Sequence, residues 1–527
     1  MRSLRVFLAT PLLAICVLAP AVAQRLPKTN PADHRYPYKP ARPGMAKTLE
    51  TSEPDTVPHT LAEALGLAYE NNPQLTGERA HLRSTDENVP TALAGWRPTI
   101  AVTGSYGYAV GRFQTANQFY NSALPPTKIV GGKLNPLTGV VTGGTDNTPN
   151  VDSKNNRTES SVQATVTQYI YRGGRTTATT HEAVNSVYAE RARLIAEEQT
   201  VFGDTINAYV TYIEDKQLLA LDRANEQVLG DELRAIDDRF KVGELTRTDV
   251  AQAEAALAQA IATRQTAEGS LETARATFVR QVGVPPSADL ADPQPLQLPV
   301  KSEKEALEQS IRNNPTVIAA KFNESQLRDS VDVAFSQLAP TLSLQGTGFE
   351  QNGTSLTRQS SYGATATMNL SLPLYQGGQE YAAIRQARQN YLQAVRQSED
   401  AERAARQQAV QAYETLVAAR ASIASSHVAV RSSEIALEGL EREALVGSAT
   451  TQAVLIGQQN LLSAEITLVQ NVTSLVTASY GVASAIGRLT ASDLGLNVPL
   501  YDETAYYKAV KDLLWGTGDR AINQSGR

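Results

Sequence analysis

The chain contains the same pattern twice, and this internal repeat constrains its fold more than any other feature. Asn71-Asn72-Pro73 recurs as Asn313-Asn314-Pro315, and Pro98-Thr99-Ile100 recurs as Pro340-Thr341-Leu342, both 242 residues later. Further along, the matching pairs lie 204 residues apart: Tyr171 and Tyr375, Tyr209 and Tyr413, Gly243 and Gly447, and Gly283 and Gly487. A duplication of this length predicts two copies of one structural unit.

The offset falls once, from 242 to 204 residues, so the first copy carries an insertion of 38 residues. Residues 111–156 are rich in Gly, Asn, Thr and Pro, which is the composition of a loop. The equivalent stretch of the second copy, residues 350–361, is short and polar. The long segments that follow match between the two copies without a gap.

Residues 1–23 are typical of an export signal. Arg2 and Arg5 precede an apolar core over residues 6–18, and Ala21-Val22-Ala23 is a small-residue cleavage site. An N-terminal anchor is the alternative, but the core is too short for a helix that spans a bilayer. The only cysteine, Cys16, lies inside this segment, so the mature chain has no disulfide and no Cys-based site. Residues 24–58 form a Pro-rich N-terminal lead.

Each copy has two alternating segments around its loop. Apolar residues occupy every second position, as at Ile100, Val102, Tyr106, Tyr108 and Val110, and again at Ala364, Ala366, Met368, Leu370 and Leu372. The intervening residues are almost all uncharged Ser, Thr, Gln and Asn. Segments of about ten residues with this period predict membrane-spanning strands, in hairpins over residues 97–171 and 339–375. Soluble hairpins that cover a core are the alternative, which the uncharged polar face and the export signal disfavour.

Four strands cannot close a membrane barrel, since the smallest barrels need about eight. An open edge in lipid leaves backbone groups unpaired at several kcal/mol each. Copies of the chain are therefore expected to share one barrel, and the strand count allows two, three or four copies. No uninterrupted apolar run of 18 or more residues follows the signal, so no membrane-spanning helix is expected.

A long proline-free segment follows each hairpin, and it predicts helices over residues 174–242 and 378–446. One helix of this length reaches about 100 Å, far beyond a bilayer core of about 30 Å, so it projects outside the membrane. Its apolar seam has heptad spacing, at Tyr188, Ile195, Phe202 and Tyr209. In the second copy Glu399 and Arg406 interrupt this seam.

Shorter returning helices are expected over residues 248–283 and 450–487, each after a glycine that ends the long helix. Thr246 or Thr248 is expected to cap the first, and Thr450 or Thr451 the second. The first repeat then covers residues 59–286 and the second residues 301–490. Residues 287–300 form a Pro-rich linker, and residues 491–527 form a C-terminal segment.

This order of elements resembles the TolC family of outer-membrane efflux proteins. The shared motifs are Asn-Asn-Pro before each hairpin, Leu-Tyr-Gln-Gly-Gly at residues 374–378, and Val-Gly-x-x-Thr-x-x-Asp-Val at residues 242–250. The expected fold is an α+β membrane protein. Each internally duplicated protomer gives four strands to a shared oligomeric transmembrane β-barrel, and its coiled-coil-like helices form a periplasmic α-barrel.

The resemblance also implies a function and partners. It implies a homotrimer in the lipid of the cell outer membrane, with its tunnel in the periplasm. A periplasmic membrane-fusion adaptor and an inner-membrane ABC or other transporter would dock to it. The function implied is a channel-tunnel that conducts exported substrates, either proteins of type I secretion or small molecules for efflux.

In channels of this kind, links between helices close the tunnel mouth near the turn from long to returning helix. Asp249 matches an acidic gate position. In the second copy Ala444 and Ala449 replace a gate tyrosine and arginine, and Ala453 and Ile456 replace an acidic ring. Ordinary solvated charges, or a helix N-terminal charge at Asp249, are the alternatives. The charged residues around the turn are the gate candidates: Asp249, Arg247, Glu244 and Arg239.

Other functional classes find little support in the sequence. The net charge of −6 argues against a nucleic-acid-binding surface. The five histidines are scattered, and no HExxH, GxSxG, P-loop or Rossmann pattern occurs, so no enzyme activity, cofactor or metal site is expected. A periplasmic coiled-coil adaptor or structural rod is the alternative function, although neither needs two hairpins with a lipid-suited face.

Overall fold

The computed structural model describes residues 57–116, 122–123, 133–134, 141–142, 150–353 and 360–518. The expected signal peptide and nearly all of the Pro-rich lead lie outside these residues, as does much of the insertion.

The first repeat contains five α-helices, one 3-10 helix and four strands within the described residues. They are α1 (Leu61–Asn71), α2 (Pro73–Asp86), α3 (Asn88–Leu93), η2 (Ala94–Trp96), β1 (Thr99–Ala116), β2 (Lys133–Leu134), β3 (Val141–Thr142), β4 (Asn150–Arg172), α4 (Arg175–Lys241) and α5 (Arg247–Val282).

The second repeat has the same order without the insertion, and two short helices follow it. Its elements are α6 (Glu303–Asn313), α7 (Pro315–Phe335), η3 (Ser336–Leu338), β5 (Thr341–Asn352), β6 (Ser360–Ser371), α8 (Gln379–Leu445) and α9 (Thr451–Ala485), followed by α10 (Ala491–Leu494) and α11 (Ala505–Val510). The long helices α4 and α8 both have 67 residues, about 100 Å each. The expected duplicated protomer with four main strands and two very long helices is confirmed.

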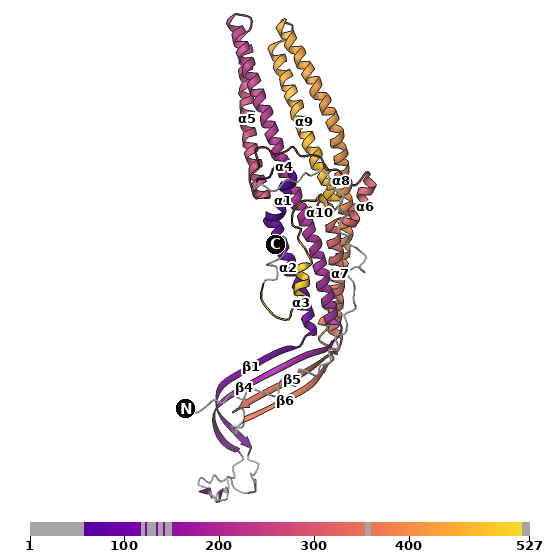
Figure 1. The fold of residues 1–527 in the computed structure, drawn as a ribbon. Coiled ribbons are helices and arrows are strands. Elements are labelled where there is room, and N and C mark those ends of the chain that lie inside the picture. The colour runs from indigo at the N-terminus through magenta and orange to yellow at the C-terminus, as the bar shows by residue number, and fades with distance from the viewer. Residues whose placement is uncertain are drawn as a thin grey trace. The chain divides into compact units, whose positions relative to one another are not determined.

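The four main strands form one antiparallel sheet in the order β1-β4-β5-β6, and β2 pairs with β3 in a separate ribbon. The pairing of β4 with β5 joins the two repeats. Figure 1 shows this sheet and the two helical hairpins, α4–α5 and α8–α9, which extend side by side.

The strands of the first repeat are longer than the expected ten residues. β1 has 18 residues and β4 has 23, whereas β5 and β6 have 12 each. Pairing in the first repeat continues from the alternating segments into the insertion, as far as Ala116 opposite Asn150. Backbone hydrogen bonding needs no apolar pattern, so alternation marks only part of each strand.

The Asn-Asn-Pro motif has the same structural role in both repeats. The Asn72 and Asn314 side chains each accept a hydrogen bond of 2.9 Å from the backbone N–H two residues later, and a proline follows at the first helical position. Their amide groups also donate to the ends of the returning helices, at the carbonyl oxygens of Gln281 (3.2 Å) and Ala485 (3.5 Å). The motif therefore fixes the start of one helix against the end of another.

The main apolar core lies where α1, α2, α4, α5 and α9 meet. Phe202, Tyr209 and Phe278 are fully buried there, and the heptad seam of α4 supplies the first two. The linker also packs into this core through Leu290 and Leu296, and the Tyr209 hydroxyl donates to a linker carbonyl oxygen at 2.7 Å. The linker is therefore part of the packed structure.

By length and composition alone, the helix α9 is long and apolar enough to cross a membrane. It is the one helix within the described residues that satisfies both criteria, with a mean hydropathy of 1.2 over its most apolar window. Gln, Ser and Thr interrupt its apolar residues, so the sequence shows no unbroken run. Its C-terminal part packs inside the protein, where Val476, Tyr480 and Val482 are buried.

Each strand-to-helix junction turns at a glycine pair with positive φ. Gly173 and Gly377 are equivalent, with φ of 60° and 74°. A Cβ at Gly173 would collide with the Cβ of Ala339 and lie 3.0 Å from the Ser336 carbonyl oxygen, whereas a Cβ at Gly377 would meet no atom within 4 Å.

Gly173→Ala should therefore destabilise the protein more than Gly377→Ala. Both variants bear the left-handed backbone cost of about 1–2 kcal/mol, and only Gly173→Ala adds an overpacking cost of about 1–3 kcal/mol. Thermal unfolding of the detergent-solubilised protein, followed by circular dichroism, measures the difference. Equal shifts in melting temperature would contradict this interpretation.

Candidate functional site

The register of the sheet collects its apolar residues on one face. Ile100 lies opposite Val166 and Val102 opposite Ala164 across β1 and β4. The same face continues across β5 and β6, where Leu342 lies opposite Leu370 and Leu344 opposite Met368. Alternation in four separate sequence segments thus becomes one continuous surface.

This apolar face is uncovered in the single chain. The exposed fractions are 71% for Val102, 82% for Tyr106, 65% for Met368 and 70% for Leu370. Glu350, near the end of β5 opposite Tyr362, is a charged residue on this face. An uncovered apolar surface of this kind marks a contact with lipid or protein.

The other face of the sheet carries hydroxyl and amide side chains. The Ser105 and Ser161 hydroxyls are hydrogen-bonded across β1 and β4 at 2.8 Å, and Asn369 donates to the Gln345 side chain across β5 and β6 at 3.3 Å. Such uncharged groups can hydrogen-bond with water, and they create a weaker electric field than a charged surface would. The sheet thus separates an apolar side from a wettable side.

Both outer edges of the sheet are open in the part of the chain that the structure describes. There β1 pairs only with β4, and β6 pairs only with β5. Each edge presents a row of N–H and C=O groups that can pair with another chain. A sheet that is apolar on one face and open at both edges is incomplete as a membrane structure.

Aromatic side chains gather where the strands meet the helices. Trp96 (39% exposed), Tyr171 (50%) and Tyr375 (78%) lie at this junction, and the Arg172 guanidinium lies 4.4 Å from the ring centre of Tyr169. Amphipathic rings are enriched at the boundary between membrane and water. The junction therefore has the chemistry of a membrane boundary.

All four gate candidates lie at the turn between α4 and α5 or in the adjoining ends of the two helices. Gly243 has a φ of 87°, which lets the chain leave α4. Across the turn, Arg239 Nε donates to Glu244 Oε2 at 3.1 Å in an exposed ion pair. Arg247 begins α5, and none of the described residues is recorded as a hydrogen-bond or ion-pair partner of its side chain.

Asp249 belongs to a capping box at the start of α5, and Thr246 is the cap. The backbone N–H and hydroxyl of Thr246 donate to Asp249 Oδ2 at 2.9 and 2.6 Å, and the N–H of Asp249 donates to the Thr246 hydroxyl at 3.3 Å. The hydrogen bonds from Thr246 lower the pKa of Asp249. The helix-terminal role considered for Asp249 is present in the structure.

The turn between α8 and α9 has the same backbone and different chemistry. Gly447 has a φ of 76°, and the Thr450 side chain caps α9 by accepting from the N–H of Ala453 at 3.2 Å. Ala453 occupies the position equivalent to Asp249. Leu445 and Val446 are 81% and 80% exposed. Leu445 stands where the first tip has Lys241, whereas Val446 matches Val242, which is 72% exposed.

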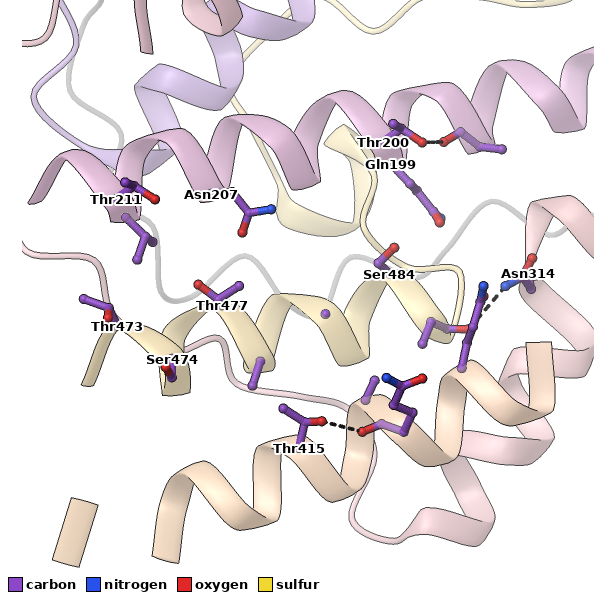
Figure 2. A pocket seen from close by; sticks show the side chains of 18 of the residues that line it. Gln199, Thr200, Asn207, Thr211, Asn314, Thr415, Thr473, Ser474, Thr477 and Ser484 are labelled. Atoms are coloured by element: carbon purple, nitrogen blue, oxygen red, sulfur yellow. Dashed lines mark hydrogen bonds between the residues drawn. The ribbon is translucent and has the colours of Figure 1, made fainter. Parts of the chain in front are cut away.

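A polar cavity of about 730 Å³ lies between α4, α8 and α9 (Figure 2). The side chains labelled there are all uncharged: Gln199, Thr200, Asn207, Thr211, Asn314, Thr415, Thr473, Ser474, Thr477 and Ser484. Glu214 also lines it and accepts a hydrogen bond from the Thr473 hydroxyl at 3.0 Å. Hydroxyl and amide groups make this a hydrated recess between the repeats.

A four-stranded sheet with a lipid-suited face, carried on two very long helical hairpins, defines one subunit of a membrane channel. A family model described as "Outer membrane efflux protein" matches residues 64–284 and 306–488, one range in each repeat. The chain belongs to this family. It is an outer-membrane channel protein of export systems, and the family is not one of enzymes.

Individual relatives agree. The chain is 32% identical to outer membrane efflux protein BepC of Brucella suis biovar 1 (strain 1330) over 459 residues, which is 87% of this chain and 91% of BepC. It is 26% identical to outer membrane protein TolC of Escherichia coli (strain K12) over 56% of this chain and 63% of TolC. The fold is similar to that of the Campylobacter jejuni CmeC outer membrane channel, with a TM-score of 0.66, 16% identity, and coverage of 82% and 86% of the two chains.

An arginine on the apolar face should block assembly into the outer membrane, and the next residue along the strand supplies a matched control. Val102→Arg puts a charge on the lipid-suited face, at a cost that falls from about 2–4 kcal/mol at mid-membrane depth to about 0–1 kcal/mol at the membrane boundary. Thr103→Arg puts the same charge on the wettable face. Outer-membrane fractionation should show loss of Val102→Arg alone, and equal loss of both variants would contradict the assignment of the faces.

Proposed function

We propose that three copies of this chain close a single barrel of twelve strands whose wettable face lines a pore. The observation that carries the proposal is the pair of open edges on an amphipathic sheet. Strand directions alternate along β1-β4-β5-β6, so β6 of one copy meets β1 of the next in antiparallel orientation. Closure of the barrel pairs the backbone N–H and C=O groups at the strand edges, which lipid cannot hydrogen-bond. The family resemblance favours three copies among the two, three or four that strand counting allows.

The helices α4, α5, α8 and α9 of the three copies would continue this pore as a tunnel on the periplasmic side. Transport through it is passive conduction, driven by an inner-membrane ABC or other transporter and coupled through a periplasmic adaptor. The cargo is either protein secreted by a type I system or small molecules, and the channel does no chemistry on it. A periplasmic adaptor or structural rod is disfavoured, because neither explains an exposed apolar sheet face.

The oligomer can be measured directly. Native mass spectrometry of the protein extracted in mild detergent should give three times the mass of the mature chain. The variant Met368→Arg, on the apolar face of β6, should fail to reach the membrane and should therefore give no such species. A monomer in the extracted wild-type protein would exclude the shared barrel, and a dimer or tetramer would replace the trimer.

We further propose that the charged tip of α4–α5 helps to close the tunnel mouth. Asp249 is held in place by Thr246, and Arg247 beside it has a charged group that can reach a neighbouring hairpin. The tip of α8–α9 has Glu443 at the position equivalent to Arg239 and uncharged residues at the positions equivalent to the other three gate candidates. Links would therefore run to another charged tip, to Glu443 or to backbone groups. Opening would then require a change in helix packing that a docked partner favours.

Loss of these charges should open the channel. The double variant Asp249→Ala, Arg247→Ala should raise single-channel conductance in planar bilayers if the two charges hold the mouth closed. Thr246→Ala is the control, because it weakens the same helix cap by about 1 kcal/mol and keeps both charges. An equal rise in Thr246→Ala would assign the effect to fraying of α5, and unchanged conductance in the double variant would remove both residues from the gate.

A further inference from the structure

Three potential metal ligands meet between α2 and α4, far from the tips and the sheet. Glu78 and His81 lie one turn apart on α2, and Glu190 faces them from α4. One ligand atom from each of these side chains lies within 4.8 Å of the other two. His81 Nδ1 is hydrogen-bonded to Glu190 Oε1 and lies 4.0 Å from Glu78 Oε1.

The cluster has one fixed ligand and two adjustable ones. The Glu190 side chain is 3% exposed, and Arg193 donates to its Oε2 at 3.0 Å, which leaves Oε1 directed at His81. The side chains of Glu78 and His81 are 28% and 59% exposed. A buried carboxylate held by an arginine is the kind of outer support that orients a metal ligand.

Of the three ligands, Glu78 lines a cavity of about 470 Å³ between α2, α4, α7 and α8. Glu78, Arg193 and Glu197 line it together with the uncharged Asn323 and Gln397. An ion therefore has a path to Glu78 and room for bound water. Glu197 adds negative charge without belonging to the ligand set.

We propose that Glu78, His81 and Glu190 form a site for a divalent transition-metal ion of the Zn²⁺ type, which links α2 to α4. Imidazole and carboxylate are ordinary Zn²⁺ ligands at about 2.0–2.2 Å, and small rotations of the two exposed side chains shorten the ligand separations to suit. Water completes the coordination. The proposal departs from the expectation that the chain has no metal site, because the sequence shows one Glu-x-x-His spacing and the third ligand is 109 residues from His81.

Metal ions bind carboxylate and imidazole in their deprotonated forms. Binding should release protons and weaken as the pH falls, with Arg193 and Glu197 as the other charges that face the ligands.

The experiment measures Zn²⁺ binding to the untagged, chelator-treated full oligomer in detergent by isothermal titration calorimetry. The wild type should bind one ion per protomer. Glu78→Gln, at a half-buried position, and His81→Gln, at an exposed one, keep the size of the ligand side chains or reduce it little, and each should weaken binding at least about tenfold. His427→Gln, at an exposed histidine of α8 outside the cluster, should bind as the wild type does.

Two further readouts separate this site from weak surface binding. Co²⁺ in place of Zn²⁺ should give a visible d–d absorption band in the wild type and in His427→Gln, and none in His81→Gln. Zn²⁺ should also raise the melting temperature of the wild type more than that of Glu78→Gln, because it links two helices of the folded state. Equal affinity in His81→Gln and the wild type, or no stoichiometric binding to the wild type, would overturn the proposal.

Discussion

The unsatisfied backbone at the two edges of the sheet is the constraint on which the rest of the structure depends. In water an open edge is tolerable, but in hydrocarbon each unpaired N–H or C=O costs several kcal/mol. The apolar face of β1, β4, β5 and β6 suits the sheet to contact with lipid. In lipid, the open edges of a single chain would have no hydrogen-bond partners. Assembly is therefore a condition of membrane insertion, and a pore lined by the wettable face is its consequence.

The duplicated sequence makes the protomer a pair of similar halves that are joined at several levels. Strand β4 pairs with β5, helix α4 packs against α7 and α9, and the linker packs between the halves through Leu290 and Leu296.

A buried polar group also fixes the N-terminal helices to the C-terminal segment. Arg79 is fully buried, donates to the Tyr69 carbonyl oxygen at 2.9 Å, and lies 5.3 Å from the ring centre of Tyr501.

The two halves have diverged where function allows. Both junctions keep a glycine pair with positive φ, and both tips keep a glycine and a capping threonine, since these positions fix the backbone. Some side chains at the tips differ: α4–α5 has a capping box and an ion pair, and on α8–α9 the exposed Leu445 takes the place of Lys241. Constant backbone with variable side chains is expected where a scaffold is retained and its contacts with partners change.

The elements whose signal is local or periodic could be predicted from the sequence alone. Spacing along the chain predicts strands and long helices without knowledge of any contact. It shows the repeat, the alternation around Ile100 and Met368, the heptad seam at Phe202 and the glycines that end the long helices. Strand length escaped this reasoning, because β1 and β4 pair beyond their alternating residues through backbone groups alone.

Which residues from distant segments meet could be read only from the tertiary structure. The register that joins four alternating segments into one apolar face and the approach of Glu190 to Glu78 and His81 both depend on packing between elements. Spacing along one helix or strand is set by local geometry and can be read directly. The distance between two elements is set by all the side chains between them, so it appears only in the folded chain.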